Sequence, residues 1–421
     1  MPYVFMHLPG EVEAVPAGVL TLTEEGPQLL ASEFEYGKRY PTRRGPDAIS
    51  VDPISLPLDQ AGQRMLPVNG LAMFGALRDA TPDDWGRRVI ENRLGEKANT
   101  LPESVYMLEA GSNRVGALDI RKELDSPPSN GSLPNAVDLQ YLVDASERVE
   151  AGLPVPQNLE LYFNGAPTLG GARPKATVED DGIEWIAKFP SIRDRFNVPS
   201  VERATLELAR RAGLSVPRTG LRTLADGRQV MLIERFDRAP VAGGMSRRHT
   251  VSALTMLGLT EHDSPKSSYA SIVRVIEQWG SHGQITAQRE ELFSRMVFNI
   301  LVTNDDDHLR NHAFVRDDGA WNLSPLYDVV PKPQAGTERN LHLGVGPRGR
   351  WATLDNALAG YGGFGLTEAR AAELIDRVVG VVRTWRSVFE ELGVTAKDCD
   401  DVASAFRRAG DIGMKEVAKF L

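Results

Sequence analysis

The stretch Asn304-Asp-Asp-Asp-His-Leu-Arg-Asn-His-Ala-Phe314 contains three consecutive acidic residues, with an asparagine shortly after them. Three carboxylates buried together repel one another unless a cation or a divided set of partners separates them. Asp306 and Asn311 have the spacing of a kinase catalytic loop, in which Asp accepts the proton of the attacking hydroxyl and Asn holds Mg²⁺. This spacing also occurs by chance. The alternative is an acidic loop that caps a helix, with His308 and His312 as ordinary polar side chains.

A second carboxylate follows a predicted β-hairpin downstream of this stretch. Asp318-Gly319 is typical of a two-residue hairpin turn. Beyond it, Leu323-Ser-Pro-Leu-Tyr-Asp328 reads as a strand-like run that ends at Asp328. Mg²⁺ is commonly bound by one or two carboxylates together with phosphate oxygens. Asp328 is therefore a candidate second metal ligand beside Asn311.

Upstream, Thr168-Leu-Gly-Gly-Ala-Arg-Pro-Lys175 forms a glycine-containing loop with basic side chains. Glycines let backbone N–H groups approach phosphates closely. The segment is neither a P-loop nor a GxGxxG motif. A plain turn between two strands is the alternative interpretation.

The next segments supply a lysine, a glutamate and a candidate hinge. Lys188 lies in the apolar run Ile183-Glu-Trp-Ile-Ala-Lys-Phe189, where a lysine needs a charge partner. Glu202, early in the following helix, is the natural candidate, giving a phosphate-binding Lys and an orienting Glu. The run Val230-Met-Leu-Ile-Glu-Arg-Phe236 resembles a strand that leads into a hinge. The loop, Lys, Glu, hinge and carboxylates occur in the order that a kinase requires.

Composition places the chain among ordinary globular proteins. It has 421 residues, of which 42% are hydrophobic and 25% charged. The net charge of −9 and the pI near 5.5 argue against a broad nucleic-acid-binding surface. The single cysteine excludes an intramolecular disulfide, and no apolar run is long enough to cross a bilayer. We therefore expect a cytoplasmic protein without a membrane partner.

The elements change along the chain from strands to helices. Short strands are predicted before residue 60, and a helix between Thr81, as its cap, and Gly95. A second helix is predicted with Ser200 as its cap and Gly213 as its end. Apolar stripes at helical spacing cover 288–303 and 367–392. Strands followed by helices favour an α+β fold over a doubly wound sheet.

Several segments together resemble the HipA family of toxin kinases. They are TLGGARPK (168–175), WIAKFP (185–190), ERFDR (234–238), NDDDHLRNHAF (304–314) and LSPLYDVVP (323–331). LLASEFEYG, SVDPISLPL and GSNRVGALDI also resemble the family's appended β-rich domain. The resemblance implies a two-lobed kinase-like fold that follows this β-rich domain along the chain. The expected domains are 1–125 (β-rich with a helix), 126–237 (strand-rich N-lobe) and 238–421 (helical C-lobe).

The resemblance also implies roles for individual residues in transfer of the ATP γ-phosphate to Ser or Thr. In the catalytic loop, Asp306 would be the base, His308 would support the loop, and Asn311 with Asp328 would ligate Mg²⁺. In the N-lobe, Lys188 would bind the α/β-phosphates and Glu202 would pair with it. Lys175, Gly170 and Gly171 would lie near the phosphates, and Glu234 and Phe236 would hold adenine largely through their backbone. Thr168 occupies the position at which family members carry a hydroxyl residue that can be autophosphorylated. In the more familiar members that residue is Ser.

Partners follow from the resemblance alone. The family implies a HipB-like helix-turn-helix antitoxin that also binds operator DNA, and a protein target, in several members an aminoacyl-tRNA synthetase. Two alternatives stay open: a small-molecule kinase of the aminoglycoside or choline type, and an inactive kinase-like co-repressor module. The presence of Lys188, Asp306, Asn311 and Asp328 together argues against a decayed enzyme.

Overall fold

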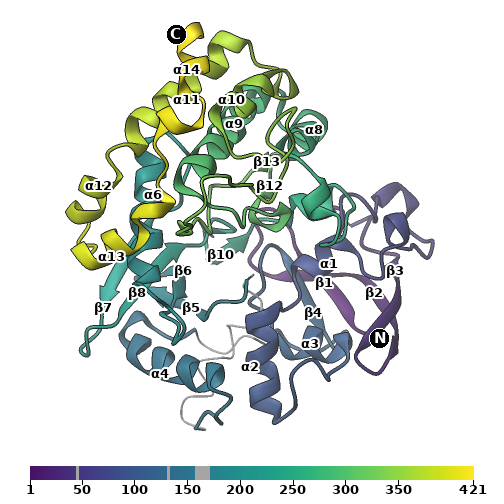
Figure 1. Ribbon diagram of the computed structural model, residues 1–421. Helices are drawn as coiled ribbons and strands as arrows, with labels where there is room; N and C mark the ends of the chain where they lie inside the picture. The colour runs from purple at the N-terminus through teal and green to yellow at the C-terminus, as the bar shows by residue number, and fades with distance from the viewer. Residues whose placement is uncertain (44–46, 130–132, 157–170) are drawn as a thin grey trace. The chain divides into compact units, whose positions relative to one another are not determined.

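The computed structural model describes residues 1–43, 47–129, 133–156 and 171–421 (Figure 1). They form an α+β protein of two compact units, as the sequence predicts for its fold class. The first unit comprises 1–193 with 222–259, and the second comprises 194–221 with 260–421. Within the described ranges, no helix is long and apolar enough to span a bilayer.

The first unit begins with an antiparallel sheet, which confirms the β-rich start. Its strands are β1 (Tyr3–His7), β2 (Ala14–Glu25), β3 (Gln28–Tyr36) and β4 (Leu118–Arg121). They lie in the order β3-β2-β1-β4, so β4 pairs with β1 although more than 100 residues separate them. The chain between β3 and β4 contains α1 (Gly75–Asp79), α2 (Asp84–Leu94) and α3 (Glu103–Glu109).

A second antiparallel sheet in this unit contains β5 (Lys175–Asp180), β6 (Ile183–Lys188) and β8 (Gln229–Glu234). Helices α2 and α4 (Leu139–Glu150) pack on it through a buried apolar cluster (Figure 1) that includes Trp85, Val89, Leu142, Val143, Ala176, Val178, Ala187 and Leu232. The Trp85 indole also donates a hydrogen bond to the Lys175 carbonyl, at 2.9 Å. The first unit ends with β9 (Arg238–Val241), β10 (Gly244–Arg247), β11 (Thr250–Ser252) and α7 (Ala253–Met256).

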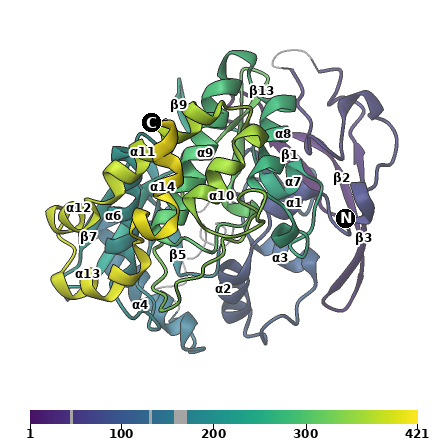
Figure 2. The same cartoon turned by 45° about the horizontal axis from the view of Figure 1, so that its top comes forward.

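The second unit is mostly helical. Its central helix, α9 (Ile285–Val302), contacts α8 (Tyr269–Trp279), α10 (Leu354–Ala359) and α11 (Glu368–Val382) (Figure 2). The remaining helices are α6 (Val198–Arg211), α12 (Trp385–Glu391), α13 (Ala396–Val402) and α14 (Met414–Val417). Within strand β7 (Thr219–Thr223) the chain leaves the second unit and re-enters the first, between Leu221 and Arg222. The hairpin β12 (Ala313–Asp317) and β13 (Ala320–Leu323) follows α9.

The hairpin turn and two helix ends are as predicted. Asp318 and Gly319 both have positive φ, at 47° and 85°, as a type I′ turn requires. Gly95 ends α2 in the left-handed region, and Gly213, with φ of 86°, follows the end of α6. Glycine suits these positions because it adopts positive φ without a steric penalty.

Both predicted N-caps are wrong by a few residues. The cap of α2 is Asp83, because Thr81 instead donates its hydroxyl to the Leu77 carbonyl at 2.7 Å. Helix α6 begins three residues earlier than expected, and Asn197 caps it by accepting a hydrogen bond from the Ser200 amide at 3.2 Å. Ser200 therefore lies in the first turn.

Two longer predictions also need correction. The stripe over 367–392 is divided into α11 and α12 at Arg383 and Thr384, where Thr384 donates its hydroxyl to the Val381 carbonyl. The strand-like run toward Asp328 ends at Leu323, because Pro325 has no N–H and the Leu326 amide donates to the Ser215 carbonyl.

The three domain ranges 1–125, 126–237 and 238–421 stay a prediction. Helix α6 falls within the predicted N-lobe range but packs against α11 and α12 of the second unit. Residues 238–259, assigned to the predicted C-lobe, belong to the first unit.

Candidate active site

The acidic stretch begins at a fixed point, the C-terminus of α9. Thr303 caps this helix in the left-handed conformation, with φ of 52°. Its hydroxyl donates to the Ala405 carbonyl, and the Lys332 amide donates to the Thr303 carbonyl at 3.1 Å. A non-glycine residue at positive φ is uncommon and needs such support. The loop that starts at Asn304 therefore leaves the helix in one defined direction.

The three acids have separate surroundings. Asp305 is half-buried and pairs with the Lys332 ammonium at 2.9 Å and with the Gln334 amide. Asp306 is exposed, and Asp307 is buried. Dividing the carboxylates in this way avoids the repulsion expected if all three were buried together. Of the three, Asp306 is the one that solvent and a substrate can reach.

Asp307 is the centre of a buried polar network in the second unit. Its Oδ2 accepts hydrogen bonds from Asn299 Nδ2 at 2.7 Å, from His312 Nε2 at 2.9 Å and from the Tyr269 hydroxyl. Burial opposes the charged carboxylate, but the His312 imidazole and the hydroxyl hold the pKa of Asp307 below its ordinary value. Burial and the carboxylate raise the pKa of Tyr269 well above its ordinary value.

Sequence reasoning missed this network. The sequence presents His312 only as an ordinary polar residue and does not mark Asn299 or Tyr269 as site residues. The one signal is the position of His312, five residues after Asp307 and just before β12.

Hydrogen bonds within the loop bring Asp306 and Asn311 together. Asn311 Nδ2 donates to the Asp306 carbonyl at 3.0 Å, and the Asn311 and His308 amides close turns onto the His308 and Asp306 carbonyls. The Asn311 side-chain oxygen takes no part in these bonds. The predicted spacing of five therefore corresponds to a direct contact.

His308 and its neighbours support the loop from the side. Its ring lies edge-on to the His342 ring, with 5.8 Å between centroids. Ser264 accepts a hydrogen bond from the Leu309 amide at 3.1 Å and also contacts His342 Nε2. Burial, and then the nearby His308 and Arg350, lower the pKa of His342.

Asp328 lies on a segment that is tied to the same loop. The hydroxyl of its neighbour Tyr327 donates to the carbonyl of Arg310, the residue before Asn311, at 2.8 Å. Asp328 itself has a φ of 58°. Sparsely populated backbone conformations of non-glycine residues cluster at functional sites, where the surrounding structure maintains them. The structure thus brings the segments of the two predicted metal ligands together.

The available donors suit a cation that also uses substrate oxygens. Among the described residues there is no group of three His, Cys, Asp or Glu side chains that could hold a metal. Asn311 and Asp328 contribute an amide oxygen and a carboxylate. Mg²⁺ is often bound by one or two carboxylates, with waters and phosphates as its other ligands. The pair therefore fits Mg²⁺ carried in with a nucleotide.

The predicted phosphate-binding residues of the first unit lie at one end of the β5–β6 pair. Lys175 of β5 is directly opposite Lys188 of β6. Opposite residues of antiparallel strands share one face of the sheet, where two like charges are destabilising unless anions are near. Gly171 has φ of 101°, and a Cβ there would lie 2.7 Å from the Lys175 Nζ. The Lys175 side chain could move aside, but the positive φ itself disfavours any residue other than glycine.

The remaining predicted residues are distributed between the units. Glu234 ends β8 opposite Trp185, and Phe236 lies in the turn after it. Glu202 lies on α6 in the second unit, whereas Lys188 is in the first, so their pairing stays a prediction. Thr168 and Gly170 lie outside the described residues.

A family model and two relatives match this chain. A family model described as the HipA-like C-terminal domain matches residues 167–385. The serine/threonine-protein kinase toxin HipA of Shewanella oneidensis is 23% identical over 305 residues, covering 66% of this chain and 65% of that protein. "Putative kinase Y4dM" of Sinorhizobium fredii is 29% identical over 263 residues, covering 59% of this chain and 60% of that protein. The chain thus spans less than two-thirds of each of these relatives.

A solved structure extends the likeness to the whole fold. The Shewanella oneidensis HipA structure, a complex with HipB and its operator DNA, aligns over 99% of this chain and 97% of that one. The TM-score is 0.68 at 17% sequence identity, which shows a shared fold.

Proposed function

The chain belongs to the HipA-like family, whose C-terminal domain model covers residues 167–385, and we propose that it is an ATP- and Mg²⁺-dependent serine/threonine protein kinase. The observation that carries this proposal is the loop geometry in the second unit. Asn311 contacts the Asp306 carbonyl, and Tyr327 ties the Asp328 segment to Arg310. An exposed carboxylate and one candidate metal ligand thus share a loop, and the segment of the second candidate ligand is bonded to that loop.

We assign the base to Asp306 rather than to either neighbouring acid. Its side chain is exposed, whereas Asp305 is paired with Lys332 and Asp307 is committed to its buried network. A general base must come within hydrogen-bond reach of the hydroxyl proton that it accepts. His308 acts as a positioning residue, because its backbone closes the turn onto Asp306.

Asn311 and Asp328 would hold Mg²⁺ through their oxygens. When bound there, the cation would offset charge on the phosphate oxygens during transfer. In the first unit, the facing Lys175 and Lys188 supply positive charge for the phosphates. Gly171 and Gly170 would let the backbone approach the phosphates, and Glu234 and Phe236 would hold adenine.

A transfer assay tests the proposed function. Purified protein, Mg²⁺ and γ-labelled ATP are incubated with a cell lysate, and labelled proteins are identified by mass spectrometry. We expect label on Ser or Thr of a protein. Label transferred only to a soluble alcohol, such as an aminoglycoside or choline, would favour a small-molecule kinase. No transfer to either class by folded protein would favour an inactive binding module.

The metal ligands have a distinct predicted phenotype. Asp328→Ala is expected to weaken Mg·ATP binding by at least tenfold, because it removes the only carboxylate of the proposed ligand pair. Asn311→Ala is expected to be milder and to be partly restored by excess Mg²⁺. Titration calorimetry at several Mg²⁺ concentrations measures both effects. Unchanged Mg·ATP affinity in Asp328→Ala would show that the ligand assignment is wrong.

The relatives suggest a partner and a regulatory role. The solved relative is a complex with HipB and operator DNA. We propose that this chain is likewise a toxin and that a HipB-like helix-turn-helix protein neutralises it. Operator DNA would be bound mainly by that antitoxin. The toxin would act by phosphorylating a protein target, and aminoacyl-tRNA synthetases are the first class of proteins to test as that target.

Thr168 is proposed as an autophosphorylation site on sequence grounds. A phosphate would add about −1.5 to −2 charges, which the nucleotide phosphates would repel. We expect prolonged incubation with Mg·ATP to add one phosphate at Thr168 while activity declines, whereas Thr168→Val stays active. Mass spectrometry locates the phosphate. Full ATP affinity in the phosphorylated protein would contradict this proposal.

A further inference from the structure

Side chains of the segment Glu234–Arg238, to which adenine binding is assigned, lie in two environments. Arg235 and Asp237 are buried, whereas Glu234 and Phe236 are half-buried. The chain turns at Phe236 and Asp237, and Arg238, the first residue of β9, is buried as well. The contacts of these three buried side chains therefore hold the backbone that would meet the nucleotide.

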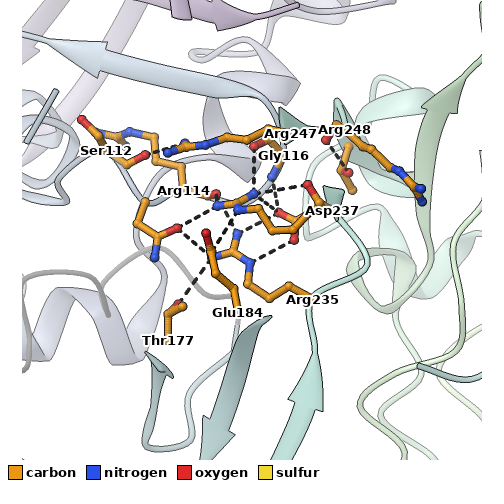
Figure 3. Close-up of polar contacts among 12 residues, drawn as sticks. Ser112, Arg114, Gly116, Thr177, Glu184, Arg235, Asp237, Arg247 and Arg248 are labelled. Atoms are coloured by element: carbon orange, nitrogen blue, oxygen red, sulfur yellow. Dashed lines mark hydrogen bonds and ion pairs between the residues drawn. The ribbon is translucent and has the colours of Figure 1, made fainter. Parts of the chain in front are cut away.

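Their contacts form a buried cluster within the first unit (Figure 3). Arg235 forms two hydrogen bonds with the Asp237 carboxylate, at 3.0 and 2.8 Å. Arg238 adds one to the same carboxylate at 2.9 Å and one to Glu184 at 3.0 Å. The side chains of Arg235, Arg238 and Asp237 are 0%, 3% and 6% exposed.

A second group of contacts comes from residues 113–116, just before β4. Asn113 Oδ1 accepts from Arg235 at 2.9 Å and from Arg238 at 2.7 Å. The Arg114 carbonyl accepts from the same two guanidinium groups, at 2.8 and 2.9 Å. The Gly116 amide donates to Asp237 at 2.7 Å. The segment 113–116 thus contacts both arginines and the aspartate between them.

The charge balance makes these neutral acceptors important. The two cations Arg235 and Arg238 are balanced in the cluster by two anions, Asp237 and Glu184. A third cation, Arg247, lies nearby and donates a hydrogen bond to the Ser112 carbonyl (Figure 3). Burial, and then the positive charges of Arg238 and Arg235, lower the pKa of Arg247. A buried guanidinium that loses an acceptor bears the full cost of its desolvation.

We propose that Asn113 is a positioning residue for nucleotide binding. By bridging Arg235 and Arg238, it holds the backbone of Glu234 and Phe236 in the conformation that receives adenine. This inference rests on the proposed function. It also links the N-terminal region, which contains Asn113, to the nucleotide site through the two arginines.

The test compares Mg·ATP binding and kinetics in Asn113 variants. Asn113→Ala is expected to raise the Kd and KM for ATP about tenfold, because two charged donors lose an acceptor. The kcat at saturating ATP should stay within about twofold, because Asp306 is untouched. Asn113→Asp should restore affinity, since a carboxylate accepts both bonds in a cation-rich site. Asn92→Ala, which alters an Asn of the same unit outside the cluster, is the matched control and should bind as wild type does.

The outcomes separate the inference from the proposed function. Wild-type protein that does not bind Mg·ATP overturns both. Wild-type binding with equal affinity in Asn113→Ala overturns the inference alone, as does a fall in kcat without a rise in KM. If Asn113→Ala does not fold, Thr177→Val removes only the 3.4 Å contact to Arg235. The KM of Thr177→Val for ATP is then expected to be about two- to threefold higher, the effect of losing one weak hydrogen bond. An unchanged KM would count against the proposal.

Discussion

Asp306→Asn is expected to reduce phosphoryl transfer by about three orders of magnitude while leaving the fold and Mg·ATP affinity nearly unchanged. A positioned general base typically contributes 10²- to 10⁴-fold to a rate. The Asp306 carboxylate is exposed, and the described part of the chain gives it no side-chain hydrogen bond, so its loss should disturb little else. The measurement is single-turnover transfer of labelled phosphate at saturating Mg·ATP, with binding followed by calorimetry.

The adjacent acid provides a matched control for this prediction. Asp305→Asn makes the same chemical change one residue away, at a carboxylate that pairs with Lys332. It should keep most of the activity, because a surface ion pair contributes only about 0–1 kcal/mol. Asp306→Asn protein that keeps a tenth of the wild-type rate would refute the base assignment. Equal losses in both variants would indicate a general effect of charge in the loop.

Local features of the sequence predicted local features of the structure well. The Asp318-Gly319 turn and the helix ends at Gly95 and Gly213 depend on backbone conformations that few other residues adopt. The Asp306–Asn311 contact spans five residues within one loop. The α+β fold followed from the order of periodic segments. In each case the determining interactions lie within a few residues of one another.

What the sequence could not show depends on distant partners. His312 is the one nearby partner that sets Asp307 apart from Asp305 and Asp306, whereas Tyr269, which also contacts Asp307, is 38 residues away. The role of Asn113 depends on arginines more than 120 residues later. The missed N-caps have a different cause: several capping residues lie close together, and local hydrogen bonds compete for them. Thr81, for example, bonds to Leu77 instead.

Asp307→Ala is expected to lower the free energy of unfolding by about 3 kcal/mol or more, because each buried donor left without an acceptor costs about 1–3 kcal/mol. The substitution leaves Tyr269, Asn299 and His312 with buried donors that lose their common acceptor. Urea unfolding, followed by intrinsic fluorescence, measures the effect. Asp306→Ala, at an exposed carboxylate in the same loop, is the control and should unfold near the wild-type midpoint.

Acid provides an independent check on this network. Because the pKa of folded Asp307 is below its ordinary value, its charged form contributes stability above the unfolded carboxyl pKa of about 3.9. That contribution is lost as the pH falls through the folded pKa. The stability difference between wild type and Asp307→Asn should therefore be fully present at pH 7 and shrink below about pH 4. A difference that stays constant to pH 2 would mean that the Asp307 charge contributes nothing, and that only the shape of its side chain matters.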